Sequence, residues 1–280
     1  MSRDSGEGGA PFDGGPQLAL PALTPLTRLL LLTNAGVFAA SFLLWLAGVW
    51  TWPERLLGLS AGLWADWFPF PPVWQIVTYG FLHSVQDPMH VLWNLLLLYF
   101  FGTMLEGLIG SRRFGVLYGA AMVCGALAHL LASTFLGPSA GIALGASGAV
   151  LGVVVAAAAL RPQAQVLVLF IPVRLWFLAA MIVGFDLFAV LVSFRTGAAD
   201  GVAHWVHLGG AAWGFVAVRK GWIHLDPLQR LRLRRERSQG NRRRANEERM
   251  DRLLAKIHDE GMASLTRSER EFLKRVSSRG

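Results

Sequence analysis

Apolar and polar segments alternate along most of this chain. Leucine, valine, alanine and phenylalanine dominate six segments, at about residues 26–50, 89–108, 114–136, 146–160, 175–194 and 203–218. Several of these reach the roughly 20 residues that a helix needs to cross a bilayer. The pattern therefore predicts an all-α fold, a polytopic membrane protein whose six transmembrane helices form a bundle over residues 25–221.

The chain outside the predicted bundle is polar, and its composition changes along its length. Residues 1–24 contain glycine, proline and aspartate without apolar periodicity, which predicts a disordered leader. Residues 222–245 are predicted to form a basic linker, whose arginines would lie against anionic lipid headgroups of the bilayer. Arginine-rich segments also bind nucleic acid, but no such partner is expected here.

The last segment, residues 246–280, has the periodicity of helices again. Apolar positions recur at helical spacing, a glycine then ends the pattern, and a capping box opens a second one. These residues are Met250, Leu253, Leu254, Ile257, Gly261, Thr266 and Glu269. The pattern predicts a small cytoplasmic helical hairpin outside the membrane.

Composition and charge agree with a membrane location. The 280 residues are 54% hydrophobic, which is high for a soluble domain of this size. The net charge of +8 belongs to one end, because the chain from Arg219 onward holds 18 of the 26 Lys and Arg residues and 9 of the 18 acids. The positive-inside rule then predicts that both termini are cytoplasmic, in the inner membrane of a cell. The single cysteine, Cys124, excludes an intrachain disulfide.

Four polar side chains that could carry chemistry lie near the starts of the second, fourth and sixth segments. His90 and Asn94 are four residues apart, which places them on one face of a helix. Ser147 and His207 open the other two segments. Because alternate spans begin on the same side of a membrane, the four groups would lie at a similar shallow depth below its outer face. Polar groups there are costly, so they should face a common interior.

Small residues explain how these groups could meet. Each of the last two segments carries two glycines four residues apart, Gly148 and Gly152 in one, Gly210 and Gly214 in the other. Small-x-x-x-small faces allow helices to cross closely, which would place Ser147 beside His207 as a nucleophile beside its general base. His90, Asn94 and the Ser147 backbone N–H would then form an oxyanion hole.

Three motifs, taken together and in this order, resemble the rhomboid family of intramembrane serine proteases. They are His90-x-x-x-Asn94, Gly145–Ala146–Ser147–Gly148, and His207–Leu208–Gly209–Gly210 with Gly214. The resemblance covers about residues 74–218, essentially the whole predicted bundle. The predicted hairpin of the tail looks like a C-terminal cytoplasmic appendage found on some bacterial members.

The resemblance implies roles for the matching residues. Ser147 would be the nucleophile and His207 the base of a dyad with no carboxylate, and His90 and Asn94 would be the oxyanion donors. The glycines of the motifs, Gly145 included, would have structural roles.

Two further positions compare with the family in opposite ways. Glu106 matches a family glutamate, which implies a structural hydrogen-bonding role. Leu151 stands where the family usually has an aromatic residue stacked on the histidine, which could leave His207 less firmly oriented.

The remaining polar and aromatic residues carry weaker expectations. His204 and His207 could bind a metal ion, but no third ligand is evident, so neither a metal nor a cofactor is expected. His204 is predicted to be a surface or loop residue at the outer mouth of the bundle. His129 and Asp186 lie inside apolar segments, and interhelical hydrogen bonds are predicted for both. The Trp-rich connection at residues 51–87 is predicted to lie in the membrane interface.

These observations predict an intramembrane serine endopeptidase that cleaves transmembrane or juxtamembrane segments of membrane proteins. Helices hide their carbonyls in hydrogen bonds, so substrates with helix-weakening Gly or Pro would be preferred. One alternative is a non-catalytic rhomboid-like binder of transmembrane helices. A transporter is another, although the sequence has no internal repeat of the kind that transporters show.

Overall fold

The computed structural model describes residues 21–136, 142–168, 171–197 and 202–224, and in the tail residues 250, 253, 257, 265, 266, 268 and 273. The chain divides into two compact units, Met1–Ile223 and His224–Gly280. Most of the predicted leader and almost all of the predicted basic linker lie outside the described residues. Three tail positions named above also lie outside them, Leu254, Gly261 and Glu269.

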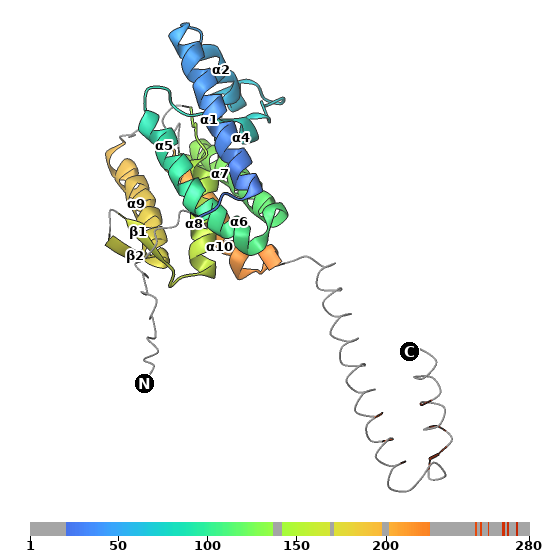
Figure 1. Ribbon diagram of the computed structural model, residues 1–280. Coiled ribbons are helices and arrows are strands. Elements are labelled where there is room, and N and C mark those ends of the chain that lie inside the picture. The colour runs from blue at the N-terminus through green and yellow to red at the C-terminus, as the bar shows by residue number, and fades with distance from the viewer. Residues whose placement is uncertain are drawn as a thin grey trace, which may run out of the picture. The chain divides into compact units, whose positions relative to one another are not determined.

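The first unit is built mainly from helices (Figure 1). The longer ones are α1 (Pro25–Leu46), α5 (Pro88–Leu97), α7 (Ser111–Leu136), α8 (Ser147–Leu160), α9 (Leu175–Thr196) and α10 (His204–Arg219). A π-helical turn, η2 (Leu98–Gly102), continues α5 into α6 (Thr103–Ile109). Four helical segments are long and apolar enough to cross a membrane, α1, α5 through α6, α7 and α9, and α8 is a shorter apolar helix. The prediction of an all-α, polytopic membrane bundle is confirmed.

The connection between α1 and α5 is folded rather than open. It contains three short helices and a 3-10 turn, α2 (Thr51–Leu57), α3 (Ala61–Asp66), α4 (Gln75–Thr78) and η1 (Tyr79–Phe81). The buried Gln75 side chain donates to the carbonyls of Arg55 and Leu56 at 3.1 and 3.2 Å, and accepts from the Ser60 N–H at 3.2 Å. The Trp74 indole N–H donates to the same Leu56 carbonyl at 2.8 Å. These bonds hold the aromatic connection against α4.

A short β-hairpin joins α8 to α9, and the sequence patterns did not predict it. Strands β1 (Gln165–Val168) and β2 (Ile171–Arg174) pair antiparallel, with Gln165 opposite Arg174. The Leu175 N–H donates to the Ala164 carbonyl at 2.8 Å and closes the base of the hairpin where α9 begins. A short 3-10 helix, η3 (Trp222–His224), follows α10.

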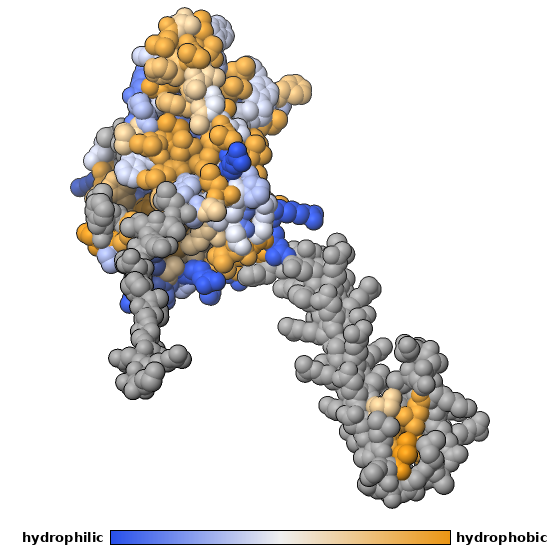
Figure 2. Space-filling model, viewed as in Figure 1, coloured by the Kyte–Doolittle hydropathy of each residue, from blue (hydrophilic) through white to orange (hydrophobic). Residues whose placement is uncertain are grey.

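The fully buried residues of helix α1 are polar, and many of its apolar residues are exposed. Within Pro25–Leu46, the buried residues are Thr27, Asn34 and Ser41, which are seven residues apart and therefore share one face. By contrast Leu29 is 58% exposed and Leu43 is 65% exposed. Figure 2 shows the resulting hydrophobic surface around α1. A helix in water buries its apolar face, so the reversed arrangement indicates that lipid surrounds the bundle.

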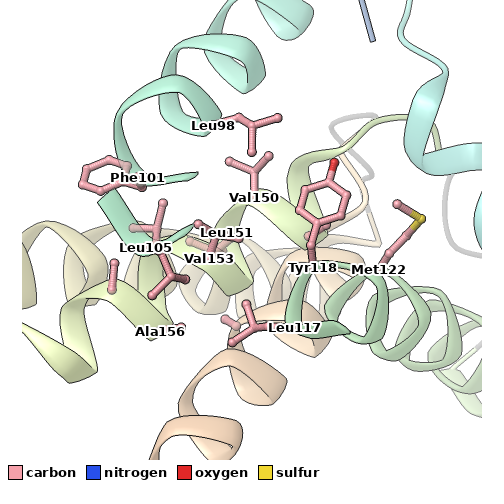
Figure 3. Packing of buried hydrophobic residues seen from close by; sticks show 14 of the residues in the cluster. Leu98, Phe101, Leu105, Leu117, Tyr118, Met122, Val150, Leu151, Val153 and Ala156 are labelled. Carbon is pink, nitrogen blue, oxygen red and sulfur yellow. The ribbon is translucent and has the colours of Figure 1, made fainter. Parts of the chain in front are cut away.

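Helix α8 is the centre of the apolar core. Ten of its 14 residues are buried, and it packs against α7, α9, α10 and η2. Figure 3 shows the side chains that meet there, Val150, Leu151, Val153 and Ala156 of α8 with Leu98, Phe101, Leu105, Leu117, Tyr118 and Met122. Because α8 is enclosed by other helices, the residue at its N-terminus has a fixed position.

The described residues of the second unit form a small apolar cluster. Leu253 and Leu265 are buried, and three partly buried residues pack against them, Met250, Ile257 and Leu273. All of these except Leu265 are in helical conformation. The predicted helical hairpin and the domain bounds assigned to the tail stay predictions.

Candidate active site

The chain turns sharply just before α8 and presents Ser147 as the first residue of that helix. Gly145 has a φ of +126°, a conformation that side chains with a Cβ rarely adopt. Its N–H donates to the Tyr79 carbonyl at 3.0 Å. Two residues earlier, Ala143 and Leu59 pair through backbone hydrogen bonds of 2.9 and 3.0 Å. The serine is therefore held both by the turn before it and by the helix after it.

Helices α8 and α10 cross with their backbones in contact. A Cβ on Gly148 would lie 2.8 Å from the Val206 carbonyl oxygen, and one on Gly152 would lie 2.8 Å from the Gly210 carbonyl oxygen. A Cβ on Gly210 would overlap the carbonyl oxygen of Gly148. A Cβ on Gly214 would likewise overlap that of Gly152. The four glycines therefore lie where the two helices meet, as their spacing predicted.

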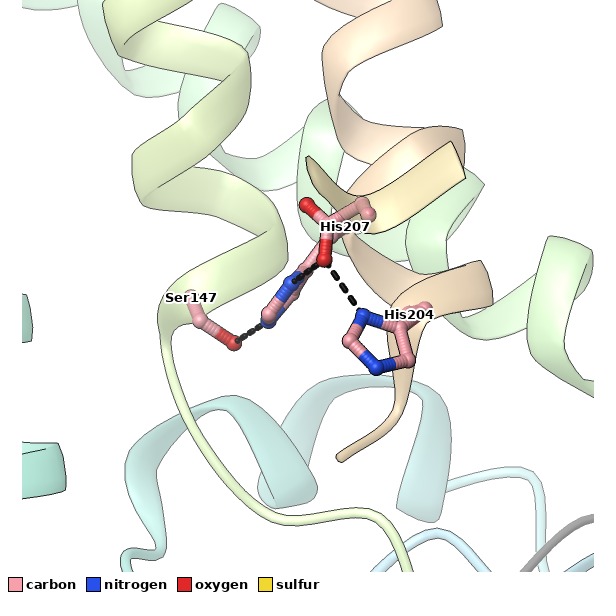
Figure 4. Close-up of polar contacts among 4 residues, drawn as sticks. Ser147, His204 and His207 are labelled. Carbon is pink, nitrogen blue, oxygen red and sulfur yellow. Dashed lines mark hydrogen bonds and ion pairs between the residues drawn. The ribbon is translucent and has the colours of Figure 1, made fainter. Parts of the chain in front are cut away.

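This crossing brings Ser147 and His207 together (Figure 4). His207 lies in the first turn of α10, and its Nε2 is 2.7 Å from the Ser147 Oγ. Both residues are partly buried. The contact predicted from the glycine spacing is thus present, and it joins a hydroxyl to an imidazole nitrogen that can accept its proton.

The other ring nitrogen of His207 faces a carboxylate. Its Nδ1 is 2.9 Å from Oδ1 of Asp186 on α9, and the same oxygen is 2.6 Å from Nδ1 of His204. Asp186 is 3% exposed and His204 is 7% exposed. The interhelical hydrogen bonding predicted for Asp186 is confirmed.

Two other expectations about this group are wrong. His204 is not a surface or loop residue at the mouth, because α10 begins at His204 and its first turn faces α9. The Ser147–His207 pair is also not without a carboxylate, because Asp186 contacts the histidine. The sequence singled out Asp186 and His204, but it gave no signal that Asp186 of α9 contacts His204 and His207 of α10.

Asp186, His204 and His207 also form a group that could hold a metal ion, since their ligand atoms lie within 4.8 Å of one another. The expectation that the two histidines have no third candidate ligand is therefore wrong. The N···O distances of 2.6 and 2.9 Å are hydrogen-bond distances. Hydrogen bonding alone accounts for these contacts.

His90 lies beside the serine turn, with Asn94 one helical turn further along α5. A Cβ on Gly145 would be 2.9 Å from His90 Nε2 and 3.6 Å from Ser147 Oγ, so both groups border the same point. Asn94 is 5% exposed, and its amide nitrogen donates to the His90 carbonyl at 2.8 Å, which uses one of its two hydrogens. The role of His90 and Asn94 in an oxyanion hole stays a prediction.

His83 is fully buried next to the same turn. The Ala146 N–H points at its Nε2 at 3.5 Å, and its ring lies edge-on to the His90 ring with centroids 5.3 Å apart. Burial, with a smaller contribution from His90, lowers the pKa of His83 to about 4. The ring is therefore neutral near pH 7, with a lone pair for the Ala146 N–H. The sequence patterns gave His83 no role of its own.

Glu106 binds the start of α1. Its carboxylate accepts hydrogen bonds from the Thr27 N–H and hydroxyl at 2.7 and 2.8 Å and from the Leu26 N–H at 2.9 Å. The hydroxyls of Thr24 and Ser111 donate to it as well, each at 2.5 Å. The first N–H groups of a helix have no partner within it, and a negative charge there is favourable. Glu106 thus connects α1, α6 and α7, which is the kind of hydrogen bonding that the resemblance implies.

Leu151 and His129 take no part in the contacts of the site. Leu151, one turn after Ser147, is 5% exposed and packs in the apolar core (Figure 3). His129 of α7 is 2% exposed, and neither of its ring nitrogens has a hydrogen-bond partner among the residues that the structure describes. Within that part of the chain, the interhelical hydrogen bond predicted for His129 is wrong.

Comparison with known families places this site inside one domain. Residues 71–223 match the family model of the Rhomboid domain, and this range contains each of the site residues described above. Residues 238–279 match the model of a family of unknown function, DUF6576. The Rhomboid match covers more than half of the chain.

Similar proteins come from yeast and from a plant. The chain is 29% identical over 206 residues to Rhomboid protein 1, mitochondrial, of Saccharomyces cerevisiae, covering 66% of this chain and 56% of that protein. It is 28% identical over 210 residues to RHOMBOID-like protein 12, mitochondrial, of Arabidopsis thaliana, covering 69% and 58%. RHOMBOID-like protein 1 of the same plant is 33% identical over 144 residues, covering 51% and 33%. The chain therefore matches a little over half the length of the first two proteins.

Proposed function

The chain belongs to the rhomboid family, and from this premise we propose that it is an intramembrane serine endopeptidase. The observation that carries the proposal is the 2.7 Å contact between Ser147 Oγ and His207 Nε2. It joins a nucleophile to a general base from different helices, inside a bundle suited to lipid. The substrates are transmembrane or juxtamembrane segments of other membrane proteins.

The reaction is acyl transfer through the serine. His207 takes the hydroxyl proton at Nε2 while Ser147 Oγ attacks the scissile carbonyl carbon. His90, Asn94 and the backbone N–H of Ser147 donate to the oxyanion that forms. His207 then gives the proton to the leaving amine, and water resolves the acyl-enzyme by the same steps in reverse.

Substrate choice follows from the hydrogen bonds of the substrate helix. An intact helix hides each carbonyl in an i to i−4 hydrogen bond, so the scissile bond becomes accessible only where the helix unwinds. Glycine and proline lower that cost, since they disfavour a helix by about 1 and 3 kcal/mol relative to alanine. The preferred substrate therefore carries Gly or Pro near the cut and a small side chain at it.

The distribution of basic residues sets the orientation that we propose. Both termini lie in the cytoplasm, with the chain in the inner membrane of a cell, and the arginines of the tail lie against anionic headgroups. The three helices that carry the serine, the base and the oxyanion donors then open on the opposite side. Cleavage would occur near the outer face of the membrane.

Cleavage by the full-length chain in liposomes tests the proposal. The substrate is a single-span protein with a Gly-Pro pair in its membrane segment, and products are followed on a gel. The wild type should cleave it, and Ser147→Ala and His207→Ala should each reduce turnover by about 1,000-fold or more. Ser41→Ala is the matched control, because Ser41 is equally a membrane-embedded serine, 2% exposed, and it should cleave normally.

A fluorophosphonate probe gives an independent readout of the serine. The wild type should be labelled at Ser147, and the Ser147→Ala variant should not be. Equal cleavage by wild type and Ser147→Ala would contradict the proposal. A wild type that binds the substrate but neither cleaves it nor takes up the probe would instead be a non-catalytic binder of transmembrane helices.

A further inference from the structure

Helix α9 is mostly apolar and carries one buried acid. Five of the 22 residues of Leu175–Thr196 are buried, and Asp186 is the only polar residue among them. An ionisable group inside a membrane is costly, so its partners show what it does there. The partners of Asp186 are the rings of His204 and His207 on α10.

Three side chains from three helices lie in sequence at this point, and Figure 4 labels two of them, Ser147 and His207. The Asp186 carboxylate of α9 is 2.9 Å from His207 Nδ1, and His207 Nε2 of α10 is 2.7 Å from Ser147 Oγ of α8. The imidazole therefore lies between a carboxylate and a hydroxyl, with one ring nitrogen toward each. His204 contacts the same carboxylate oxygen at 2.6 Å and fixes its position from a second direction.

The carboxylate decides which nitrogen of His207 carries the hydrogen. An ionised carboxylate only accepts hydrogen bonds, so the ring nitrogen that faces it must be N–H. In a neutral ring the other nitrogen, Nε2, then holds the lone pair. That nitrogen faces Ser147, so Asp186 selects the tautomer in which His207 can accept the serine proton.

We propose that Asp186 is a positioning residue that completes a carboxylate–imidazole–hydroxyl triad with His207 and Ser147. This inference rests on the proposed function and deepens it. The serine proton moves to Nε2, the Nδ1 proton stays on the ring, and Asp186 remains ionised throughout. Its negative charge, 2.9 Å from the ring, stabilises the imidazolium that forms. His204 holds the carboxylate and does not exchange a proton with the substrate.

Asp186 could have a purely structural role, in which its hydrogen bonds only hold α9 against α10. The Asp186→Asn substitution separates this role from the proposed effect on His207. Asparagine has nearly the same shape and keeps one oxygen that can accept from the histidines. Its amide N–H₂ can also donate to His207 Nδ1, which would place the ring hydrogen on Nε2 and block proton transfer from the serine. Hydrogen bonds between α9 and α10 remain possible after this substitution, whereas the negative charge and the enforced tautomer of His207 are lost.

The test compares Asp186→Asn and His204→Gln with the wild type, full length and in liposomes, using the single-span substrate described above. We expect Asp186→Asn to lower kcat by about 100-fold or more with KM within twofold, since the same change in a serine-protease triad costs about 10⁴-fold. Fluorophosphonate labelling should slow in parallel, while the thermal midpoint stays close to wild type. His204→Gln should lower kcat by less than about tenfold, because His207 keeps its carboxylate.

Proton NMR of the wild type, labelled with ¹⁵N-histidine, gives a readout that needs no cleavage. The hydrogen between His207 Nδ1 and the Asp186 carboxylate should give a low-field signal coupled to a histidine nitrogen. The signal should vanish in Asp186→Asn and persist in Ser147→Ala and in His204→Gln, which removes the other histidine hydrogen bonded to the same carboxylate oxygen. A wild type without it would overturn the proposal even if no variant could be purified.

Failure of this inference is distinct from failure of the proposed function. If Ser147→Ala is inactive while Asp186→Asn keeps the wild-type kcat, the protein is a serine protease and Asp186 is no part of its mechanism. If Asp186→Asn and His204→Gln lose activity and thermal stability equally, Asp186 only pins the helices and the triad is overturned. If Ser147→Ala still cleaves, the proposed function itself fails.

Discussion

Helix α10 is held between two neighbours by opposite means. On the α8 side the contact is backbone against backbone, through glycines that leave no room for a Cβ, and ten of the 14 residues of α8 are buried. On the α9 side only five of 22 residues are buried, and one carboxylate contacts two imidazoles across the gap. One contact is steric and apolar, and the other is a local set of polar hydrogen bonds.

The two contacts of α10 meet different requirements of the site, namely the position of its side chains and the tautomer of His207. Close packing fixes where Ser147 and His207 lie, because helices in backbone contact have no freedom to separate. It cannot determine which ring nitrogen carries a hydrogen, because that depends on charge and hydrogen bonding. The loosely packed helix supplies that part through Asp186. Each side can therefore be disturbed separately.

The largest effect is expected from breaking the α8–α10 contact with Gly210→Ala. The new methyl group would overlap the Gly148 carbonyl oxygen, and backbone cannot rotate away as a side chain can. The free energy of unfolding should fall by about 3 kcal/mol, the upper end of the usual cost of overpacking. Turnover should fall on the order of 100-fold, because a shift of about 1 Å between reacting groups has that effect. Unfolding in detergent and cleavage in liposomes measure the two quantities.

Gly119→Ala on α7 is the matched control. A Cβ there would meet no heavy atom within 4 Å, so the methyl group fits and lowers the entropy of the unfolded chain. The variant should be as active as wild type and slightly more stable, by about 0.5–1 kcal/mol. Equal activity in Gly210→Ala and Gly119→Ala would show that the glycine contact does not set the geometry of the site.

A smaller effect is expected from pH, and it should act on the α8 side of the site. The pKa of His83 lies at about 4 in the fold, against 6.5 for an ordinary histidine. A lowered folded-state pKa means that the contribution to stability is complete above about pH 6.5 and is lost as the pH falls toward 4. At pH 5 the loss should be about 2 kcal/mol, at about 1.4 kcal/mol per pH unit. Protonation would also remove the acceptor for the Ala146 N–H.

His83→Gln tests this, because glutamine keeps a polar group in the site but does not titrate. The free energy of unfolding in detergent, measured at pH 7 and pH 5, should drop by about 2 kcal/mol more in the wild type than in the variant. The same drop in both proteins would mean that other groups cause the acid sensitivity and that His83 does not support the serine turn.

The two sides of the site also differ in how far the sequence predicts them. The glycine contact follows from spacing alone, since residues four apart share a helix face. Asp186 does not follow, because it lies ten residues before the end of α9, about 15 Å along the helix, whereas His207 lies only about 5 Å from the start of α10. If the end of α9 and the start of α10 lay at the same depth in the membrane, Asp186 and His207 would be about 10 Å apart along the helix axes. The two residues meet only because the two helix ends lie at different depths.

Other features were hidden for similar reasons. Thr27, Asn34 and Ser41 of α1 are seven residues apart in the sequence. Many apolar residues lie between them, so the mean hydropathy of the segment does not reveal the polar face. The β-hairpin between α8 and α9 is too short for a period-two pattern to stand out. The helices were predictable from long apolar segments, and the serine–histidine contact from the spacing of the glycines. Local polar partners depend instead on how the helices are offset along their axes.

The smallest effect is expected from a substitution on the lipid-facing side of α9. Phe188 of α9 is 63% exposed, and its ring faces lipid, whereas the buried Asp186 of the same helix makes the hydrogen bonds to α10. Phe188→Ala should change the free energy of unfolding in detergent by less than about 0.5 kcal/mol and kcat by less than twofold. Leu178→Ala, at a position only 8% exposed on the same helix, should cost about 2 kcal/mol. A cost for Phe188→Ala as large as that for Leu178→Ala would mean that α9 is held by apolar packing on both faces, and the contrast between the two neighbours of α10 would disappear.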